Sequence, residues 1–408
     1  MANPEHVALV RQGAKAIAEW RRQHPRAPLN LRECDFTGIS LIEADLERAK
    51  ARRAKFSRAN LRGAKLNHAD LREADLSGAD LSQAHLLSAD LSGANLDGAK
   101  LVGATLPHAR LREASLRAAD VSAAYLDGAD MVAANLKDAN LSDAWLMSAR
   151  LNAANLKDTN LSRANLMWAD LSRANLNGAN LSKAQMRETS LNSVDLGRAV
   201  GLGTVSHGPP SGIDVNTLLR SVLGAGRKLT PEMRTFFLGA SVPKELLDAL
   251  PRAVARIKYY SCLISYGQPD LKFAEKLREH LKGKGIDCWL YHKDMTVGKR
   301  TWPEIEENLE EHERMVVLCS KAALRRQAVK KEIDKQIDKN PDKLIPVSLD
   351  DDWKQHGFKA EWAGRDLKTW LLDRNYADFA NKPYEEALED LLKGLRRPEA
   401  KKPRRKKG

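Results

Sequence analysis

The sequence predicts a multidomain protein in which a solenoid of stacked coils precedes an α/β domain with a parallel sheet. Two observations predict the solenoid. A large apolar residue recurs at every fifth position from Leu31 to Leu196, and alanine lies two residues before most of these positions. A third observation predicts the α/β domain, because short apolar strands alternate with polar helices from Lys258 onward.

The five-residue pattern is nearly unbroken. The large position is Leu, Phe, Met or Val except at Ala51, and the small position is alanine from Ala44 to Ala184 except at Thr159. A period of five fits neither a helix nor a flat strand. It fits a four-sided coil with one pentapeptide on each side, both columns pointing inward and polar residues facing water. At a spacing of ~4.8 Å between strands, the rod would be roughly 40 Å long.

This pattern resembles that of the pentapeptide-repeat family over residues 31–200, and the resemblance implies a right-handed quadrilateral β-helix. The open ends of a solenoid need caps. Apolar residues recur at helical spacing from His6 to His24, so we expect an N-terminal capping helix within residues 1–30. The alternative is a free amphipathic helix.

A linker and a helical spacer are expected after the repeats. Residues 201–213 are rich in Gly, Pro and Ser, which is typical of a domain boundary. Residues 214–255 then form a small spacer that we expect to seal the C-terminal end of the rod. Its expected helices are Val215–Leu223, Pro231–Leu238 and Pro243–Leu250.

The α/β domain is expected over residues 256–397. Strands that alternate with helices imply a parallel sheet covered on both faces, with ligands at the carboxyl ends of the strands. The expected strands are Tyr259–Ser265, Ile286–Leu290, Met315–Ser320 and Leu344–Leu349, and the expected helices are Leu271–Lys282, Thr301–His312, Ala322–Lys339 and Tyr384–Leu395.

Residues 258–396 resemble a TIR domain. Tyr259–Ala274 is similar to its first conserved box, Gly285–Gly298 to its second strand and BB loop, and Val316–Ser320 to its third strand. Lys330–Ile333 matches the helix that follows. The resemblance implies a flavodoxin-like α/β fold, and another flavodoxin-like domain is the alternative.

The resemblance implies two possible functions. Some TIR domains are assembly modules, whereas others hydrolyse or cyclise NAD⁺ with one glutamate on the helix after the third strand, which is Glu332 here. A single carboxylate suffices, because it can stabilise the oxocarbenium-like transition state while nicotinamide leaves as a neutral molecule. NAD⁺ would be the substrate, and we expect neither a further cofactor nor a metal.

Other pocket residues carry over from the family by position. For Trp302, packing between helix and sheet is an equal alternative. Cys262, Cys288 and Cys319 are expected to be buried strand residues rather than nucleophiles. The expected substrate-binding residues are Ser265, Tyr266, Tyr291, Asp294, Trp302 and Ser320.

Charge and composition restrict the partners. The chain has 67 basic and 54 acidic residues and so a formal charge of +13. Residues 31–200 are nearly neutral, with 22 basic and 21 acidic residues. Residues 398–408, expected to be a disordered tail, carry six basic residues and one acid. Nucleic-acid binding is therefore suggested only by this tail and by the basic stretch 46–65, for which a solvated face is the alternative.

A cytoplasmic location is expected. The sequence has no apolar run long enough to span a membrane and no secretory signal at its N-terminus. Its four cysteines form no CxxC pair, which fits a reducing compartment.

The leading hypothesis is a TIR effector of bacterial immune defence that consumes NAD⁺ when copies self-associate through the TIR domain, the rod, or both. The rod would be an assembly or sensing platform. The alternative is a non-catalytic scaffold that binds partner TIR proteins. It is favoured by Gly267 and by Arg326–Val329, where many enzymatic members carry a polar or basic residue and Ser-x-Trp.

Overall fold

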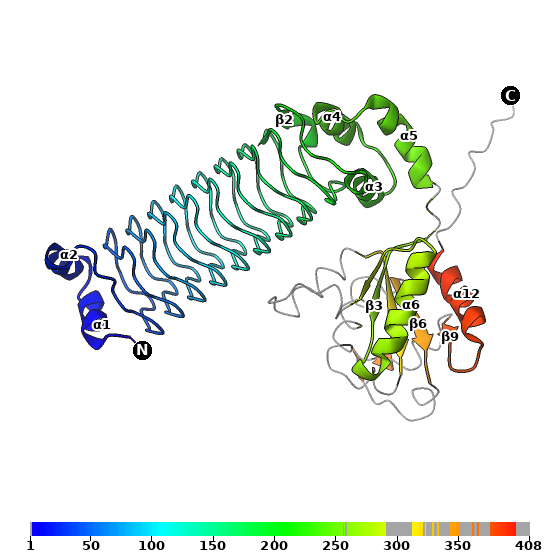
Figure 1. The fold of residues 1–408 in the computed structure, drawn as a ribbon, viewed down its shortest axis with the longest axis horizontal. Helices are drawn as coiled ribbons and strands as arrows, with labels where there is room; N and C mark the ends of the chain where they lie inside the picture. Colours follow the sequence, from blue (N-terminus) through cyan, green and yellow to red (C-terminus); the bar gives the residue numbers. More distant parts are fainter. Residues whose placement is uncertain are drawn as a thin grey trace. The chain divides into compact units, whose positions relative to one another are not determined.

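The computed structural model describes residues 2–255, 257, 259–290, 312–320, 343–350 and 376–396, with the helical positions 323, 329 and 333 and the hairpin residues 361–362 and 365–366. The chain divides into two compact units, Met1–Ala255 and Arg256–Gly408. Figure 1 shows a solenoid with helices at both ends in the first unit and a sheet flanked by helices in the second.

Each coil of the solenoid contains twenty residues. Parallel bridges join residues twenty positions apart, such as Asn30 with Lys50 and Lys50 with Asp70. The backbone N–H of Leu31 donates to the carbonyl of Lys50, with 2.8 Å between nitrogen and oxygen. Four pentapeptides therefore make one coil, and every coil is hydrogen-bonded to the next.

The corners of the coils are turns with a left-handed residue. The N–H of Ala44 donates to the carbonyl of Leu41, and Glu43, the second of the two residues between them, has φ of 55°. Positive φ occurs at every fifth position from Glu33 to Ser193. A positive φ at the third residue of a four-residue turn is the signature of a type II turn, which favours glycine. Most of these positions are not glycine, so the coil holds many residues in a conformation that they disfavour.

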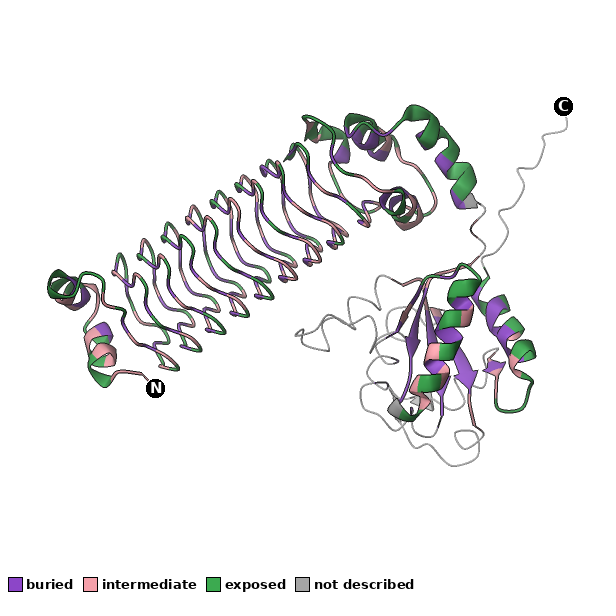
Figure 2. Cartoon of the chain, in the orientation of Figure 1, coloured by how far each residue is buried: buried purple, intermediate pink, exposed green. Residues whose placement is uncertain are grey.

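The lumen is filled by the two inward columns. Leucine and alanine side chains there are almost completely buried, and Figure 2 shows the buried positions recurring along every coil. Thr159 replaces alanine and is also buried, and its hydroxyl donates to the carbonyl of Leu136 at 2.7 Å. The single polar exception to the alanine column is therefore satisfied by a hydrogen bond, as a buried hydroxyl requires.

Two helices, not the single one expected, close the N-terminal end of the solenoid. Gly13, with φ of 93°, separates α1 (Pro4–Arg11) from α2 (Ala14–Gln23). Arg21 is 7% exposed and donates to three backbone carbonyls, those of Ala27, Asp45 and Glu47. These bonds occupy acceptors in the first coil, which has no preceding coil to pair with.

Side chains of α3 (Val215–Gly224) close the other end of the solenoid. The N–H of Val194 donates to the hydroxyl of Thr217 at 3.1 Å, and the N–H of Leu196 donates to that of Ser221 at 3.0 Å. In an earlier coil the N–H equivalent to that of Leu196 donates to the next coil, as Leu156 does to Asn175, whereas the equivalent of Val194 donates within its own turn, as Ala154 does to Leu151. The Ser221 hydroxyl thus replaces an acceptor of the missing coil, and the Thr217 hydroxyl is inserted into the last turn, where it also donates to the carbonyl of Leu191.

The helical spacer continues with α4 (Pro231–Gly239) and α5 (Lys244–Ala255), close to the expected ranges. Short elements connect the last coil to this spacer: β1 (Gln185–Met186), η1 (Leu202–Thr204) and β2 (Ser206–His207). Strand β2 pairs in parallel with β1, so His207 extends the stack of coils.

A five-stranded parallel sheet forms the centre of the second unit, in the order β4-β3-β5-β6-β9. The strands follow the expected ones except for the short fifth strand, which the sequence analysis did not predict. They are β3 (Cys262–Ser265), β4 (Cys288–Leu290), β5 (Arg314–Cys319), β6 (Leu344–Ser348) and β9 (Ala377–Asp378).

Helices α6 (Leu271–Gly283) and α12 (Tyr384–Leu395) pack on this sheet and share its apolar core. They contact each other through a hydrogen bond of 2.8 Å between His280 Nδ1 and the hydroxyl of Tyr384. A two-stranded antiparallel pair, β7 (Glu361–Trp362) with β8 (Arg365–Asp366), was not predicted either. Thr301–His312, expected as a helix, lies outside the described residues apart from His312, and of Ala322–Lys339 only positions 323, 329 and 333 are described, as helix.

Two adjacent alanines should respond in opposite ways to glycine. Ala123 is exposed with φ of 53°, so Ala123→Gly should raise the free energy of unfolding by about 0.5–1 kcal/mol, because relief of the left-handed strain exceeds the entropy cost of glycine. Ala124 is fully buried, so Ala124→Gly should lower it by about 1.5 kcal/mol. Urea unfolding measures both variants, and changes of the same sign would contradict the assignment.

His207 should make the joint between the last coil and α4 sensitive to acid. Its ring meets Phe236 edge-on at 4.7 Å, and a Cβ added at Gly239 would lie 2.5 Å from it. Neither ring nitrogen has a hydrogen-bond partner among the described residues, and burial lowers the pKa of His207 below its ordinary 6.5.

Because the unfolded chain takes up this proton first, the stabilisation by neutral His207 is complete above pH 6.5 and is lost as the pH falls towards the lower folded-state pKa. Hydrogen exchange of the α4 amides between pH 5 and 8 measures the loss. His207→Leu should flatten the pH dependence, and His68→Leu, at an exposed histidine, should leave it unchanged. An unchanged slope in His207→Leu would refute the role of His207.

Candidate functional site

The candidate site lies at the carboxyl edge of the parallel sheet. Strand β3 ends at Ser265, β5 ends at Cys319, and β6 ends at Ser348. The register pairs Ser265 with Val317 and Cys319 with Ser348, so the three strand ends are adjacent along one edge. Ligands of parallel α/β sheets bind at this edge.

A serine–aspartate pair connects two segments at this edge. The Ser320 hydroxyl donates to Asp270 Oδ2 at 2.6 Å and accepts the N–H of Ala323 at 3.0 Å. Asp270 ends the short helix η2 (Gln268–Asp270) and precedes α6, but its side chain forms no cap bond with that helix. Its carboxylate is therefore directed to the residue that follows β5.

The surroundings of this pair favour the protonated form of Asp270. Burial raises the pKa of Asp270, the hydrogen bond from Ser320 opposes this shift, and the charge of Asp350 adds to it. A cation placed near both carboxylates would relieve their repulsion. The edge is therefore suited to a group that carries or develops positive charge.

Three of the expected binding residues lie at this edge. Ser265, Tyr266 and Ser320 are all at least 95% buried, so they belong to the interior and not to an open surface. The side chain of Tyr266 is part of the apolar core of this unit. The remaining expected residues lie outside the described residues, as does the BB loop Tyr291–Arg300: they are Tyr291, Asp294, Trp302 and the expected catalytic residue Glu332.

Asp270 and Ser348 were not among the predicted site residues. Ser348 is fully buried, and its hydroxyl donates to the carbonyl of Asp350 at 3.1 Å. Asp270 could have been found from its position, because it is the acid that ends the loop Tyr266–Asp270 between the first strand and the first helix. Ser348 carries no such signal, because it looks like any small residue at the end of a strand.

The strand cysteines are buried, as expected. Cys262 and Cys288 occupy paired positions on β3 and β4, with 3.3 Å between their sulfur atoms. The contact with Cys288 and burial raise the pKa of Cys262 well above its ordinary value, and burial raises the pKa of Cys319 to about 12. Cys262 and Cys319 are therefore protonated near neutral pH, and protonated thiols are poor nucleophiles.

The basic stretch 46–65 encircles the rod and does not form a patch. Because one coil holds twenty residues, this stretch makes one complete coil, and its side chains point away from all sides. Arg52 and Arg53 both pair with Glu73 of the next coil, and Lys55 lies 3.9 Å from Asp35. A nucleic-acid strand lying along one side could contact only some of these residues.

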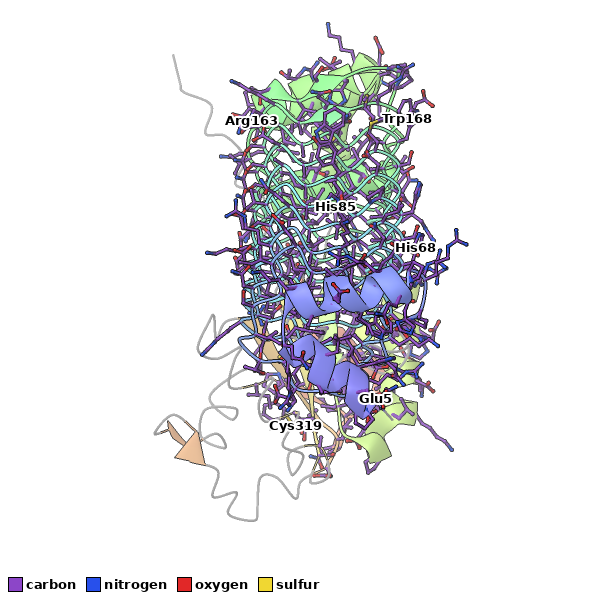
Figure 3. All side chains as sticks on the ribbon, turned by 90° about the vertical axis from the view of Figure 1, so that its left-hand side faces the viewer. Glu5, His68, His85, Arg163, Trp168 and Cys319 are labelled. Carbon is purple, nitrogen blue, oxygen red and sulfur yellow. The ribbon has the colours of Figure 1, made fainter. Side chains whose placement is uncertain are left out.

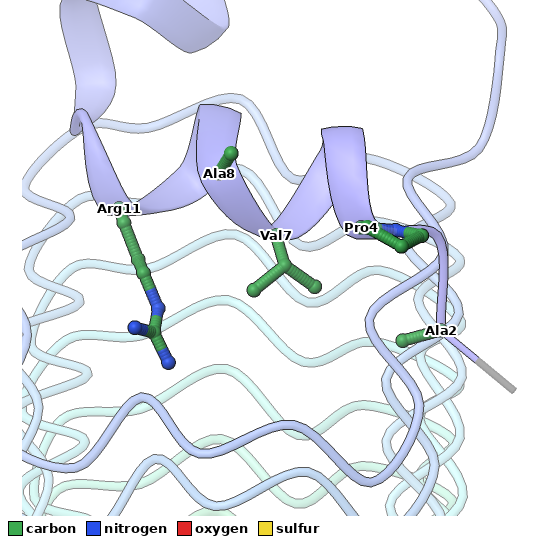
Figure 4. Close-up of a pocket in the computed structure, with 5 residues that line it drawn as sticks. All are labelled: Ala2, Pro4, Val7, Ala8 and Arg11. Carbon is green, nitrogen blue, oxygen red and sulfur yellow. The ribbon is translucent and has the colours of Figure 1, made fainter.

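Other features of the described residues suggest no chemistry. An apolar hollow beside α1 is lined by Ala2, Pro4, Val7, Ala8 and Arg11 (Figure 4). No group of His, Cys, Asp or Glu within the described segments could hold a metal ion. No described helix is both long and apolar enough to cross a bilayer.

Family comparisons agree with both resemblances. The model of the TIR domain matches residues 263–392. The model of pentapeptide repeats, eight copies long, matches six overlapping or adjacent segments: 30–67, 69–107, 94–131, 114–152, 134–173 and 164–200. The chain is therefore a pentapeptide-repeat protein that carries a C-terminal TIR domain. No curated protein matches the chain significantly.

Several solved structures are similar to this chain, and HetL and Rfr23 among them are pentapeptide-repeat proteins. HetL, involved in heterocyst differentiation regulation in the cyanobacterium Nostoc sp. strain PCC 7120, is 29% identical, with 49% of this chain and 93% of HetL covered and a TM-score of 0.35. QnrB1, a plasmid-mediated fluoroquinolone resistance protein, is 20% identical over 47% of this chain and 98% of its own, at a TM-score of 0.32. Rfr23 from the cyanobacterium Cyanothece 51142 is 22% identical, with 40% of this chain and 90% of Rfr23 covered and a TM-score of 0.13.

The Ser320–Asp270 bond should be measurable as a coupling energy. Ser320→Ala should lower the free energy of opening of β5 by about 1–2 kcal/mol, because a partly buried carboxylate loses its donor. In an Asp270→Ala background the same change should cost about 1 kcal/mol less. Hydrogen exchange of the β5 amides measures all four proteins, and additive effects would disprove the coupling.

Proposed function

We propose that the TIR domain cleaves NAD⁺ and releases nicotinamide when copies of this chain self-associate, with Glu332 as the catalytic residue. The product is either the hydrolysed or the cyclised nucleotide. The pentapeptide-repeat rod serves as an assembly or sensing platform, and the setting is bacterial immune signalling in the cytoplasm. NAD⁺ is a substrate in this proposal, and no metal takes part.

The cluster at the carboxyl edge of the sheet is the observation that supports the proposal. Ser265, Tyr266 and Ser320 all lie at the strand ends there, in a domain that matches the TIR family. The carboxylate of Asp270, with its raised pKa, adds negative charge at the same edge. A cationic nicotinamide ring would reduce the repulsion between Asp270 and Asp350.

The proposed chemistry breaks the bond between nicotinamide and ribose. The bonding electrons leave with nicotinamide, which becomes neutral, and the ribose develops oxocarbenium character. The Glu332 carboxylate stabilises this cation by its charge and by hydrogen bonds to ribose hydroxyls. Water then adds to the cation and releases a proton, or an adenine nitrogen closes a cyclic product.

The architecture supports a specific fold assignment for each of the two units. Coils of four pentapeptides with two inward columns favour the right-handed quadrilateral β-helix that the family resemblance implies. The parallel strand order β4-β3-β5-β6-β9, in which the first strand of the domain lies between the second and third, favours a flavodoxin-like TIR domain. We adopt both assignments.

Gly267 favours a second candidate function, a non-catalytic scaffold that binds partner TIR domains. Gly267 is buried beside Tyr266 and contributes no side chain to the edge where enzymatic relatives often have a polar one. Partner binding would then survive Glu332→Ala but fail in Gly298→Pro, a change in the BB loop. Pull-down with a partner TIR domain separates this function from catalysis.

Nicotinamide release from NAD⁺ tests the catalytic proposal. Concentrated wild-type protein should release nicotinamide, and Glu332→Ala should reduce the rate at least about a hundredfold, because the transition state loses its stabilising charge. Glu389→Ala removes an exposed acid on α12 and should keep the wild-type rate. Mass spectrometry identifies the product. Equal rates for wild type and Glu332→Ala, or no release by any assembled protein, would refute catalysis.

A further inference from the structure

One side of the solenoid differs from the others in composition. Residues stacked twenty positions apart form columns, and four of these columns begin at Glu43, Asp45, Glu47 and Arg48 and run to 183, 185, 187 and 188. The column from Asp45 forms the flat of this side, and turn residues form its two edges. Figure 3 shows Arg163 at one edge, His68 and Trp168 at the other, and His85 between them. We call this surface the aromatic side.

The middle of the aromatic side is nearly free of formal charge. Over the coils from 83 to 168, the charged residues in the four columns are Asp127 and the ion pair of Asp143 with Arg163, apart from two histidines. Tyr125, Trp145 and Trp168 are each more than 40% exposed, and Leu87 is 38% exposed.

The opposite side of the rod is charged over the same coils. One of its columns contains Asp97, Arg117, Lys137 and Lys157, and the adjacent column adds Asp138 and Asp158. Aromatic residues and methionine are enriched at the centres of protein–protein interfaces, and charged residues are depleted there. The aromatic side therefore has the composition of an interface.

The geometry of the aromatic residues favours a protein partner over a base or a sugar. Tyr125 and Trp145 are stacked, with ring centroids 6.0 Å apart and planes inclined by 23°. The Arg187 guanidinium covers the ring of Trp168 at 5.5 Å from its centroid. Since a neighbouring side chain already covers one face of each ring, that face is not free to stack on a base or a sugar.

The two ends of the aromatic side carry complementary charges. Near the N-terminal end, Glu43, Glu47 and Arg48 stand in three columns. Seven coils further on, the same columns hold Lys183, Arg187 and Glu188, each of opposite sign. Glu43 and Lys183 are both exposed, and neither takes part in an ion pair within the described residues.

We propose that two copies of the chain pair antiparallel through their aromatic sides, which specifies the rod contact of the self-association proposed above. A two-fold axis that passes between the coils of Thr105 and Tyr125 brings each column against the same column of the other copy, with the residues in reverse order. The end charges then meet their opposites: Glu43 with Lys183, Glu47 with Arg187, and Arg48 with Glu188.

The same arrangement pairs the central residues without conflict. His85 lies opposite Trp145, Leu87 opposite Met147, and Thr105 opposite Tyr125, and no two like charges face each other along these columns. A parallel arrangement would instead place Lys65 against Lys65 and Asp45 against Asp45. Electrostatics therefore select the antiparallel pair.

The contact area predicts a weak dimer. Eight coils at ~4.8 Å by five residues at ~3.3 Å give about 600 Å² per copy, or about 1,200 Å² in total. This lies at the lower limit for specific interfaces. We therefore expect dissociation in the micromolar range and a response to local concentration.

Sedimentation velocity of the full chain from about 1 to 100 μM tests the pairing. Wild type should pass from monomer to dimer, and Trp145→Glu should remain monomeric, because it places an uncompensated charge in the centre. Ala118→Glu puts the same charge at an exposed position on the opposite side and should dimerise like wild type. Circular dichroism checks that each variant is folded. A monomeric wild type, or an unchanged dimer in Trp145→Glu, would overturn the proposal.

Charge reversal tests the register. Glu43→Lys and Lys183→Glu should each weaken dimerisation roughly five- to tenfold at low salt, since each places like charges together at two symmetric points. The double variant should regain most of the wild-type affinity. Failure of this rescue would rule out the antiparallel register.

The BB-loop variant separates the rod contact from a TIR contact. The rod dimer should persist in Gly298→Pro. Loss of the dimer in Gly298→Pro combined with its retention in Trp145→Glu would assign self-association to the TIR domain and overturn the proposal. A chain that dimerises as described but releases no nicotinamide from NAD⁺ would refute the proposed catalysis and leave the pairing intact.

Discussion

The first unit depends on the backbone hydrogen bonds between adjacent coils, which bridge residues twenty positions apart. They fix four pentapeptides per coil, and this fixes which residues point inward. They also require a tight corner every five residues, which explains the long series of left-handed residues from Glu33 to Ser193. The strain at each corner persists because the bonds on either side over-determine the conformation.

The same constraint makes the ends of the solenoid chemically special. A coil without a neighbour exposes a full set of backbone groups, and such a template would pair with other chains. Arg21 occupies three carbonyls at one end, and Thr217 and Ser221 accept two N–H groups at the other. These residues have no role in the five-residue pattern, and their importance follows only from their position against the terminal coils.

Periodic features of this protein can be predicted from the sequence, whereas contacts between residues distant in the sequence cannot. The inward columns could be predicted because each residue repeats the role of the one five positions earlier. The division of the N-terminal cap at Gly13 could not, because apolar spacing continues on both sides of it. Nor could the contact between Asp270 and Ser320, since fifty residues separate them and only the parallel register brings them together. That the basic stretch 46–65 forms a ring around the rod also depends on the length of the coil, twenty residues, which the spatial pairing fixes.

A weak contact on the rod acquires a function when it is combined with a second one. If the rod and the TIR domain each provide a micromolar contact, the second contact forms within a complex already held by the first, at an effective concentration that can reach millimolar. Neither contact alone would then assemble the protein at low abundance, but the two together would do so steeply as its concentration rises. The low charge in the middle of the aromatic side fits such a threshold, because a strong, highly charged interface would keep the chains paired at all concentrations.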